Sequence, residues 1–216
     1  MAKKRWAAVL VASLACGALS YQLTAPPSGQ RSIREFDPDR VADLELRMWQ
    51  AYYDKARVRL LALLDTVLRE QYHYSWTTAT AEGFHLARAA ARFGDPAGTD
   101  AGVVLPDLER AYATAARWHR AGFDPRAVAR AELAWWVARR TPGRNDADQV
   151  GRLIAAEYAL LYETPFEGVL KAGLLRAEAA ALRDREAARP DWAAIGALLR
   201  DSYRELRATL GAALGD

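Results

Sequence analysis

Residues 192–213 read WAAIGALLRDSYRELRATLGAA, and their apolar side chains recur every three or four positions. This spacing places apolar side chains on one face of an α-helix. The stripe consists of Trp192, Ile195, Leu199, Tyr203, Leu206, Leu210 and Ala213. The segment therefore predicts an amphipathic helix that packs its apolar face against other helices.

The rest of the chain repeats this pattern. Alanine, leucine, arginine and glutamate dominate whereas valine, isoleucine and threonine are sparse, a composition that favours helix over strand. Asp37-Pro38 combines an N-cap residue with a proline at the first helical position, and the following pattern predicts one helix of roughly 35 residues that ends near Tyr74. The later helices are expected at about 79–93, 106–119, 125–140, 146–163, 165–188 and 192–213.

These helices predict an all-α fold. No linker between them is long or polar enough to separate two domains, and no sequence period repeats. We expect a single helical domain over residues 37–216, built as an antiparallel bundle of about seven helices. An α-solenoid is the alternative.

The amino terminus has the pattern of an export segment. Lys3, Lys4 and Arg5 precede an apolar run at 6–23, and a linker rich in proline, glycine and serine follows at 24–36. Residues 1–23 are either an uncleaved membrane anchor or a cleavable signal peptide. We expect a bacterial inner-membrane protein with its helical domain in the periplasm or outside the cell, or a secreted protein if the segment is cleaved.

Charge and cysteine content exclude several classes. Lys3, Lys4 and Arg5 account for the formal charge of +3, because the other residues include 27 basic and 27 acidic side chains. Such a balance argues against nucleic acid as a partner, since nucleic-acid-binding domains normally carry a clustered basic face. Cys16 is the only cysteine, so an intramolecular disulfide is impossible.

Two Glu-x-x-His pairs raise the possibility of a metal site. Glu70/His73 and Glu82/His85 flank a polar turn, and His119 is expected at the same end of the bundle. A glutamate and a histidine three residues apart on one helix share a face and together suit iron or zinc. The alternative is that these histidines only stabilise helix ends.

The pairs resemble part of the ferritin-like di-iron carboxylate pattern, which carries Glu-x-x-His on two helices and one further glutamate on each of two others. Glu132 and Glu157 would supply the further carboxylates. The chain departs from that pattern because its two pairs flank a single turn instead of lying on well-separated helices.

Three glutamates lie in aromatic, apolar stretches. Glu45 belongs to LELRMWQAYY, Glu132 to ELAWW and Glu157 to AAEYALLY. A buried carboxylate must be paired or protonated, so we expect either Arg–Glu pairs that fix helix register or a cavity that contains acid/base carboxylates. The aromatic residues expected to bound such a cavity are Trp49, Tyr53, Trp135 and Trp136.

Three longer segments carry a resemblance to a group of proteins. LELRMWQAYYDKARVRLLALLDTVLREQY, ELAWWVARR and RDREAARPDWAAIGALLRDSYREL look like segments of uncharacterised exported helical proteins from bacteria. The resemblance spans most of the chain after residue 35. It implies the fold and the compartment, and it implies no activity.

The sequence lacks the motifs of common enzymes: a glycine-rich phosphate loop, a Gly-x-Ser-x-Gly elbow, Cys-x-x-Cys and His-Glu-x-x-His. We therefore expect an envelope-located, non-enzymatic domain without a cofactor, in a structural or protein-interaction role. Its partners would be the membrane, through the N-terminal segment, and a protein that contacts Trp76, Trp118 and Tyr162. The alternative is a metal-dependent, di-iron-like oxidoreductase that uses Glu70, His73, Glu82, His85 and His119.

Overall fold

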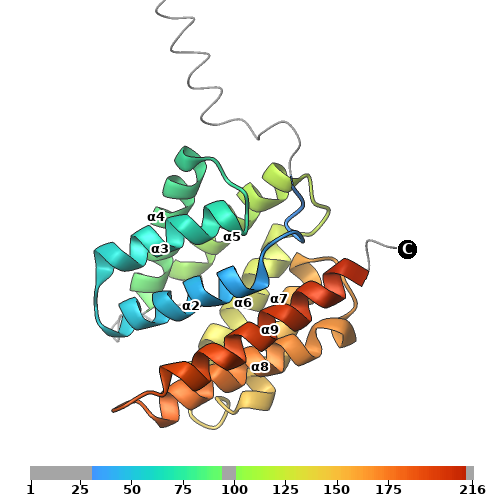
Figure 1. Ribbon diagram of the computed structural model, residues 1–216. Coiled ribbons are helices and arrows are strands. Elements are labelled where there is room, and N and C mark those ends of the chain that lie inside the picture. The colour runs from blue at the N-terminus through green and yellow to red at the C-terminus, as the bar shows by residue number, and fades with distance from the viewer. Residues whose placement is uncertain (1–30, 94–100, 213–216) are drawn as a thin grey trace, which may run out of the picture.

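The computed structural model describes residues 31–93 and 101–212, and within them it contains eight helices and no strand. The helices are α2 (Pro38–Tyr53), α3 (Arg57–Glu70), α4 (Trp76–Phe93), α5 (Ala101–His119), α6 (Pro125–Arg140), α7 (Ala147–Leu161), α8 (Phe166–Arg185) and α9 (Trp192–Ala212). Sequential helices run antiparallel (Figure 1). The predicted all-α fold of antiparallel helices is confirmed.

The helices form a closed ring. Within the described chain, each helix packs against the helix before it and the helix after it, and α9 packs against α2. Figure 1 shows α9 lying along α2 on one side and α8 on the other. Arg204 of α9 forms an ion pair with Asp39 of α2 at an N–O distance of 2.6 Å, on the outside of this contact.

The prediction of one long helix up to Tyr74 is wrong, and the bundle has eight described helices where about seven were expected. The break between α2 and α3 lies at residues 54–56, where Lys55 has a φ of 56°. The Ala56 amide donates a hydrogen bond to the Ala51 carbonyl at 2.8 Å, the bond that closes a helix in a Schellman motif. Glycine normally marks this turn, and its replacement by lysine hides the break in the sequence.

Aspartate caps begin four of the described helices. The Asp37 carboxylate accepts hydrogen bonds from the amides of Asp39 and Arg40 at 3.0 and 3.1 Å. Asp124, Asp146 and Asp191 cap α6, α7 and α9 in the same way. The side-chain oxygens satisfy amides that have no partner within the helix, which explains why Asp-Pro correctly predicted the starts of α2 and α6.

The predicted signal or anchor segment, residues 1–23, lies outside the described residues, as does most of the predicted linker. Ile33 and Phe36 are buried in the core, so the packed body begins ahead of residue 37, where the domain was expected to start. Among the described helices, none combines the length and apolarity that a membrane crossing requires.

Glycines allow α7 and α8 to approach closely. A methyl group added at Gly173 would contact the Gly151 carbonyl oxygen and come within 2.8 Å of the Ala155 amide nitrogen. Both atoms belong to the backbone of α7, so neither moves without shifting the helix. Gly173 therefore sets the separation of the two helices.

We expect Gly173→Ala to lower the free energy of unfolding by about 1–3 kcal/mol, because the added methyl overpacks the contact. Urea unfolding followed by circular dichroism measures the change. Gly83→Ala in α4 is the matched control, since its methyl would meet nothing closer than the Leu68 Cδ1 atom at 3.6 Å, and alanine is the better helix former. Equal effects of the two substitutions would contradict the tight α7–α8 contact.

Candidate functional site

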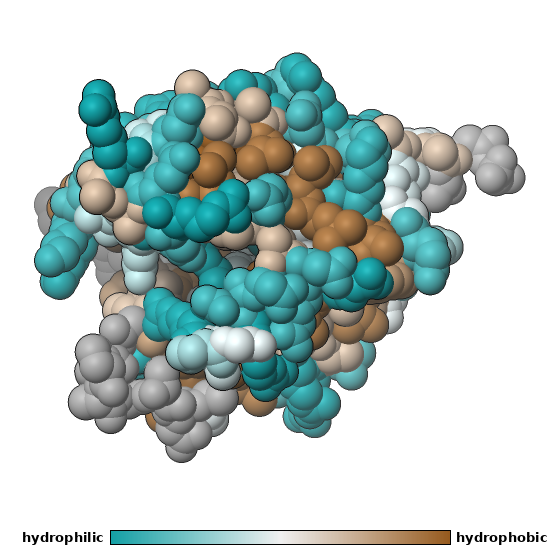
Figure 2. Space-filling view, turned by 90° about the horizontal axis from the view of Figure 1, so that it is seen from below, coloured by the Kyte–Doolittle hydropathy of each residue, from teal (hydrophilic) through white to brown (hydrophobic). Residues whose placement is uncertain are grey.

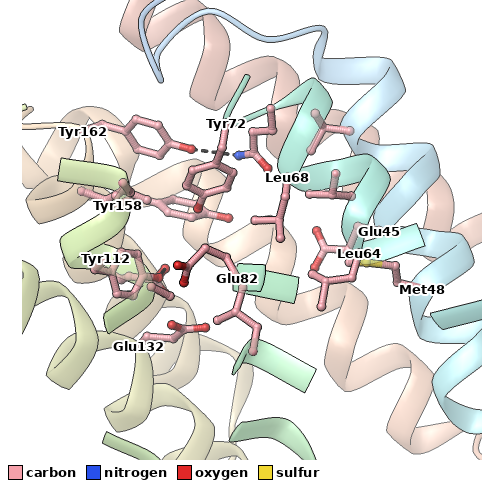
Figure 3. Close-up of a pocket in the computed structure, with 18 of the residues that line it drawn as sticks. Glu45, Met48, Leu64, Leu68, Tyr72, Glu82, Tyr112, Glu132, Tyr158 and Tyr162 are labelled. Carbon is pink, nitrogen blue, oxygen red and sulfur yellow. Dashed lines mark hydrogen bonds between the residues drawn. The ribbon is translucent and has the colours of Figure 1, made fainter. Parts of the chain in front are cut away.

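A cavity of about 170 Å³ lies inside the helix ring and is lined by residues from all eight described helices. This central cavity is polar for a protein interior. Four glutamates line it: Glu45, Glu82, Glu132 and Glu157. Six tyrosines line it as well: Tyr72, Tyr74, Tyr112, Tyr158, Tyr162 and Tyr203. Figure 3 shows carboxylates and phenol rings from different helices facing one another across this space.

Both carboxylate oxygens of Glu45 have hydrogen-bond partners. Arg176 of α8 donates two hydrogen bonds to Glu45 Oε1, at 3.0 Å from Nε and 2.6 Å from Nη2. The Tyr203 hydroxyl of α9 donates to Glu45 Oε2 at 2.5 Å. Burial lowers the pKa of Arg176, but Glu45 together with Tyr158 and Tyr203 more than compensates, so that pKa stays well above its ordinary value. Arg176 is therefore charged, and its hydrogen bonds and that of Tyr203 tie Glu45 of α2 to α8 and α9.

Glu157 of α7 accepts two hydrogen bonds from uncharged donors. The Tyr112 hydroxyl donates to Oε1 at 3.1 Å, and the Trp135 indole N–H donates to Oε2 at 2.5 Å. Burial raises the pKa of Glu157, while the nearby Arg176 guanidinium and these two donors oppose the rise.

Glu132 of α6 lies close enough to Glu157 for the two carboxyl groups to interact. Burial, and next the Glu157 carboxylate, raise the pKa of Glu132 to about 8, against opposing contributions from Tyr112 and Arg176. The Oε2 atom of Glu132 is buried without a hydrogen-bond partner among the described residues. Burial and the neighbouring Glu157 carboxylate therefore favour the protonated form of Glu132 at neutral pH.

Glu82 and Tyr158 also present unused polar atoms. Glu82 Oε1 accepts a hydrogen bond from the Thr114 hydroxyl at 3.0 Å, but Glu82 Oε2 and the Tyr158 hydroxyl have no partner in the described part of the chain. Both residues are only 5% exposed. Together with Glu132, they give the cavity three buried polar atoms that lack a hydrogen bond, a rare condition in folded proteins.

Two of the predicted metal ligands lie away from this cavity. Glu70 forms an exposed ion pair with Arg40 at 2.7 Å. The His73 Nε2 atom lies 2.6 Å from the Glu35 carbonyl oxygen. Glu70 is the last residue of α3, and His73 has a φ of 51°, so the two do not share a helical face.

The other predicted ligands are divided among separate sites. Glu82 lines the cavity, whereas the His85 Nδ1 atom lies 2.9 Å from the Arg88 guanidinium and 3.7 Å from Asp107. His119 stacks on Tyr74 with a centroid distance of 6.1 Å, and its ring also contacts the His73 ring edge-on at 6.4 Å, away from Glu82 and His85. Among the described residues, no group of three or more histidine, cysteine, aspartate or glutamate side chains is arranged to hold a metal ion.

The three predicted buried carboxylates, in contrast, come together. Glu45, Glu132 and Glu157 all line the central cavity, and the expected Arg–Glu pair is present at Glu45 alone. Of the aromatic residues expected around such a cavity, Trp135 lines it, and the other three do not.

Sequence reasoning missed the roles of Glu82, Arg176 and the tyrosines. Glu82 was assigned to a metal motif, and Arg176 is one of many arginines. The tyrosines occur at helical spacing, as core residues do. The sequence feature that could have identified these tyrosines is a phenol group at positions where a purely apolar core would have leucine.

Some apolar side chains are exposed on α3 and α4. Val58 is 86% exposed, Trp76 60% and Phe84 59%. Figure 2 shows, on the face seen from below, a strip of apolar residues with hydrophilic residues on either side. Of the aromatic residues predicted to contact a protein partner, Trp76 is exposed but Trp118 and Tyr162 are buried. The latter two therefore belong to the core.

Comparison of the chain with protein-family models, with curated proteins and with solved structures finds no match. The functional proposals below are drawn from the geometry.

Proposed function

We propose that the protein is a non-enzymatic, ligand-binding helical domain of the bacterial envelope, and that its central cavity binds one small polar organic molecule. The observation that supports binding is the set of unpartnered atoms inside the cavity: Glu82 Oε2, Glu132 Oε2 and the Tyr158 hydroxyl. Leaving a buried polar group without a hydrogen bond costs about 1–3 kcal/mol. A ligand that bonds all three atoms recovers much of that cost.

The volume of the central cavity limits the size of the ligand. An apolar cavity of about 150 Å³ holds a molecule of the size of benzene, and the central cavity measures about 170 Å³. Pockets for drug-sized ligands are about 300–1,000 Å³. The proposed ligand therefore has about six to eight non-hydrogen atoms, which is smaller than a nucleotide or a peptide.

The envelope location in this proposal rests on Lys3, Lys4 and Arg5 followed by the apolar run at 6–23, the pattern of an export segment. A ligand-binding domain in that compartment would meet small molecules from outside the cell. The proposed role needs no metal and no chemical step.

A cavity-filling variant tests the proposal. Ala115 is buried and lines the cavity, so Ala115→Leu would occupy the space that the ligand needs. We expect at least one member of a panel of neutral, cationic and anionic molecules of this size to raise the melting temperature of the purified full-length protein. At about 100 times its Kd, the shift should be about 5–10 °C, and it should vanish in the variant.

The variant must keep its helical circular dichroism and a cooperative transition. Ala111→Val, at a second buried position on the cavity wall, replaces it if it does not fold. A panel in which no molecule stabilises the wild-type protein, or an equal shift in wild type and a folded cavity-filled variant, would overturn the proposal.

A further inference from the structure

The charges that line the cavity are unbalanced. Arg176 is the one cationic side chain among the described residues that line the cavity, and it pairs with Glu45. Glu82, Glu132 and Glu157 have no cationic hydrogen-bond or ion-pair partner within the described chain. Because charges interact strongly in a protein interior and a buried carboxylate is costly without a counter-charge, a cationic ligand is favoured over an anionic one.

The unpartnered atoms specify the kind of cation. An ionised carboxylate only accepts hydrogen bonds, and a phenol oxygen accepts as well as donates. Glu82 Oε2 and the Tyr158 hydroxyl thus offer acceptors, and Glu132 Oε2 offers a third when Glu132 has lost its proton. A primary ammonium group has three N–H donors and no acceptor. A quaternary ammonium group offers no donor, and a neutral alcohol offers only one.

The aromatic lining adds to the attraction for a cation. Tyrosine rings attract a cation that lies over their faces within about 6 Å of the centroid. Six tyrosines and Trp135 line the cavity, so an ammonium group held by the carboxylates would be close to π-systems as well.

Apolar side chains line the cavity as well. In Figure 3, Leu64 and Met48 lie across the space from Tyr112 and Glu132, next to Glu45. Leu68 and Leu86 belong to the same lining. A ligand with a short hydrocarbon part opposite its ammonium group would bury that part here, which contributes about 0.8 kcal/mol for each CH₂ group.

Building on the proposed function, we propose that the ligand is a small primary alkyl- or arylalkyl-ammonium compound. Its –NH₃⁺ group bonds Glu82, Glu132 and the Tyr158 hydroxyl, and its hydrocarbon part contacts the leucines of α3 and α4. The cavity excludes long polyamines by its volume of about 170 Å³.

The protonation of Glu132 couples this binding to pH. Glu132 faces Glu157 from α7, Tyr112 from α5 and Arg176 from α8, and with burial these groups place its pKa at about 8. Below that pH, the ligand must displace the proton from Glu132 in order to gain a charged partner. Affinity therefore rises by up to tenfold for each pH unit up to about 8 and then levels off, while a primary amine stays charged to about pH 10.

The test is isothermal titration calorimetry of the purified full-length protein with pentylammonium, pentan-1-ol and tetramethylammonium as probes. We expect pentylammonium to bind and to release protons below pH 8, which titrations in two buffers of different ionisation enthalpy measure. Glu82→Gln and Glu132→Gln should each weaken pentylammonium binding by about tenfold or more. Glu205→Gln, which changes an exposed carboxylate on α9, should leave the affinity unchanged.

The outcomes separate the two proposals. If pentan-1-ol or tetramethylammonium binds as tightly as pentylammonium, or if both cavity variants retain wild-type affinity while keeping their helical circular dichroism, the ammonium inference fails and the proposed cavity binding stands. If only anionic members of the thermal panel bind, the ammonium inference fails in the same way. If no probe and no panel member binds, both proposals fail.

Discussion

Replacing Arg176 with methionine should lower the free energy of unfolding by about 3–5 kcal/mol, because it leaves the Glu45 carboxylate buried without its counter-charge. Two of the three hydrogen bonds to Glu45 come from Arg176, at 3.0 and 2.6 Å. The side chains of Arg176 and Glu45 are 17% and 4% exposed, so bulk solvent is a poor substitute for the lost partner. Urea unfolding of the full-length protein, followed by tryptophan fluorescence, measures the loss.

Two control variants distinguish the stability effect of breaking a buried ion pair from that of breaking an exposed ion pair. The double variant Glu45→Met/Arg176→Met should regain most of the lost stability, because apolar residues often replace a buried ion pair without net cost. Lys171→Met breaks the exposed pair with Glu205, whose side chains are 68% and 41% exposed, and should cost less than about 1 kcal/mol. If Arg176→Met lowers the free energy of unfolding no more than Lys171→Met does, the result would contradict the burial of Glu45 described above.

Glu132→Gln should abolish a loss of stability that the wild-type protein suffers as the pH rises. Glu132 has a pKa of about 8 in the folded protein, against an ordinary value of 4.5. Below pH 4.5 both the folded and the unfolded state hold the proton. Between pH 4.5 and 8 the folded state keeps a proton that the unfolded state has lost, so folding becomes less favourable by up to about 5 kcal/mol.

Urea unfolding at each pH unit from 4 to 9 measures this profile. The variant should be more stable than the wild type at pH 8.5 and close to it at pH 4.5, whereas Glu205→Gln should retain the wild-type slope. A wild-type stability that is flat between pH 5 and 8.5, or a variant with an unchanged slope, would contradict a protonated Glu132.

At acid pH, a different residue, His119, determines how the stability depends on pH. Burial lowers the pKa of His119 to about 4, against smaller opposing contributions from backbone groups of Arg31 and Tyr72. The folded protein therefore keeps His119 neutral, and stability falls as the pH drops from 6.5 towards 4, where the unfolded state gains a proton first. Glu132→Gln should leave this acid limb in place, so the two effects can be measured separately.

Periodicity and caps were enough to predict most of the helices, because both act within a few residues. The stripe on α9 and the aspartates at Asp37 and Asp124 are local signals of this kind. The break at Lys55 gave no such signal, since the left-handed turn is held by the Ala56–Ala51 bond and not by a glycine. Closure of the ring between α2 and α9 is a contact between opposite ends of the chain, and no local pattern specifies it.

The candidate site was predictable only in part, for a related reason. Glu45, Glu132 and Glu157 stood out because a carboxylate on an apolar stripe must find a buried partner. The Glu-x-x-His rule assumed a continuous helix, but α3 ends between Glu70 and His73. Which carboxylates meet Arg176 depends on how the helices pack.

The contact between α9 and α2, which closes the helix ring, affects when the protein can fold during its synthesis. The ribosome makes α2 before the other described helices, yet α2 lacks one of its two neighbours among them until Trp192–Ala212 has been made. Glu45 likewise meets Tyr203 only at that stage. A nascent chain is thus kept from completing its interior early, which would suit the proposed export, because an exported polypeptide passes through a translocation channel before it folds.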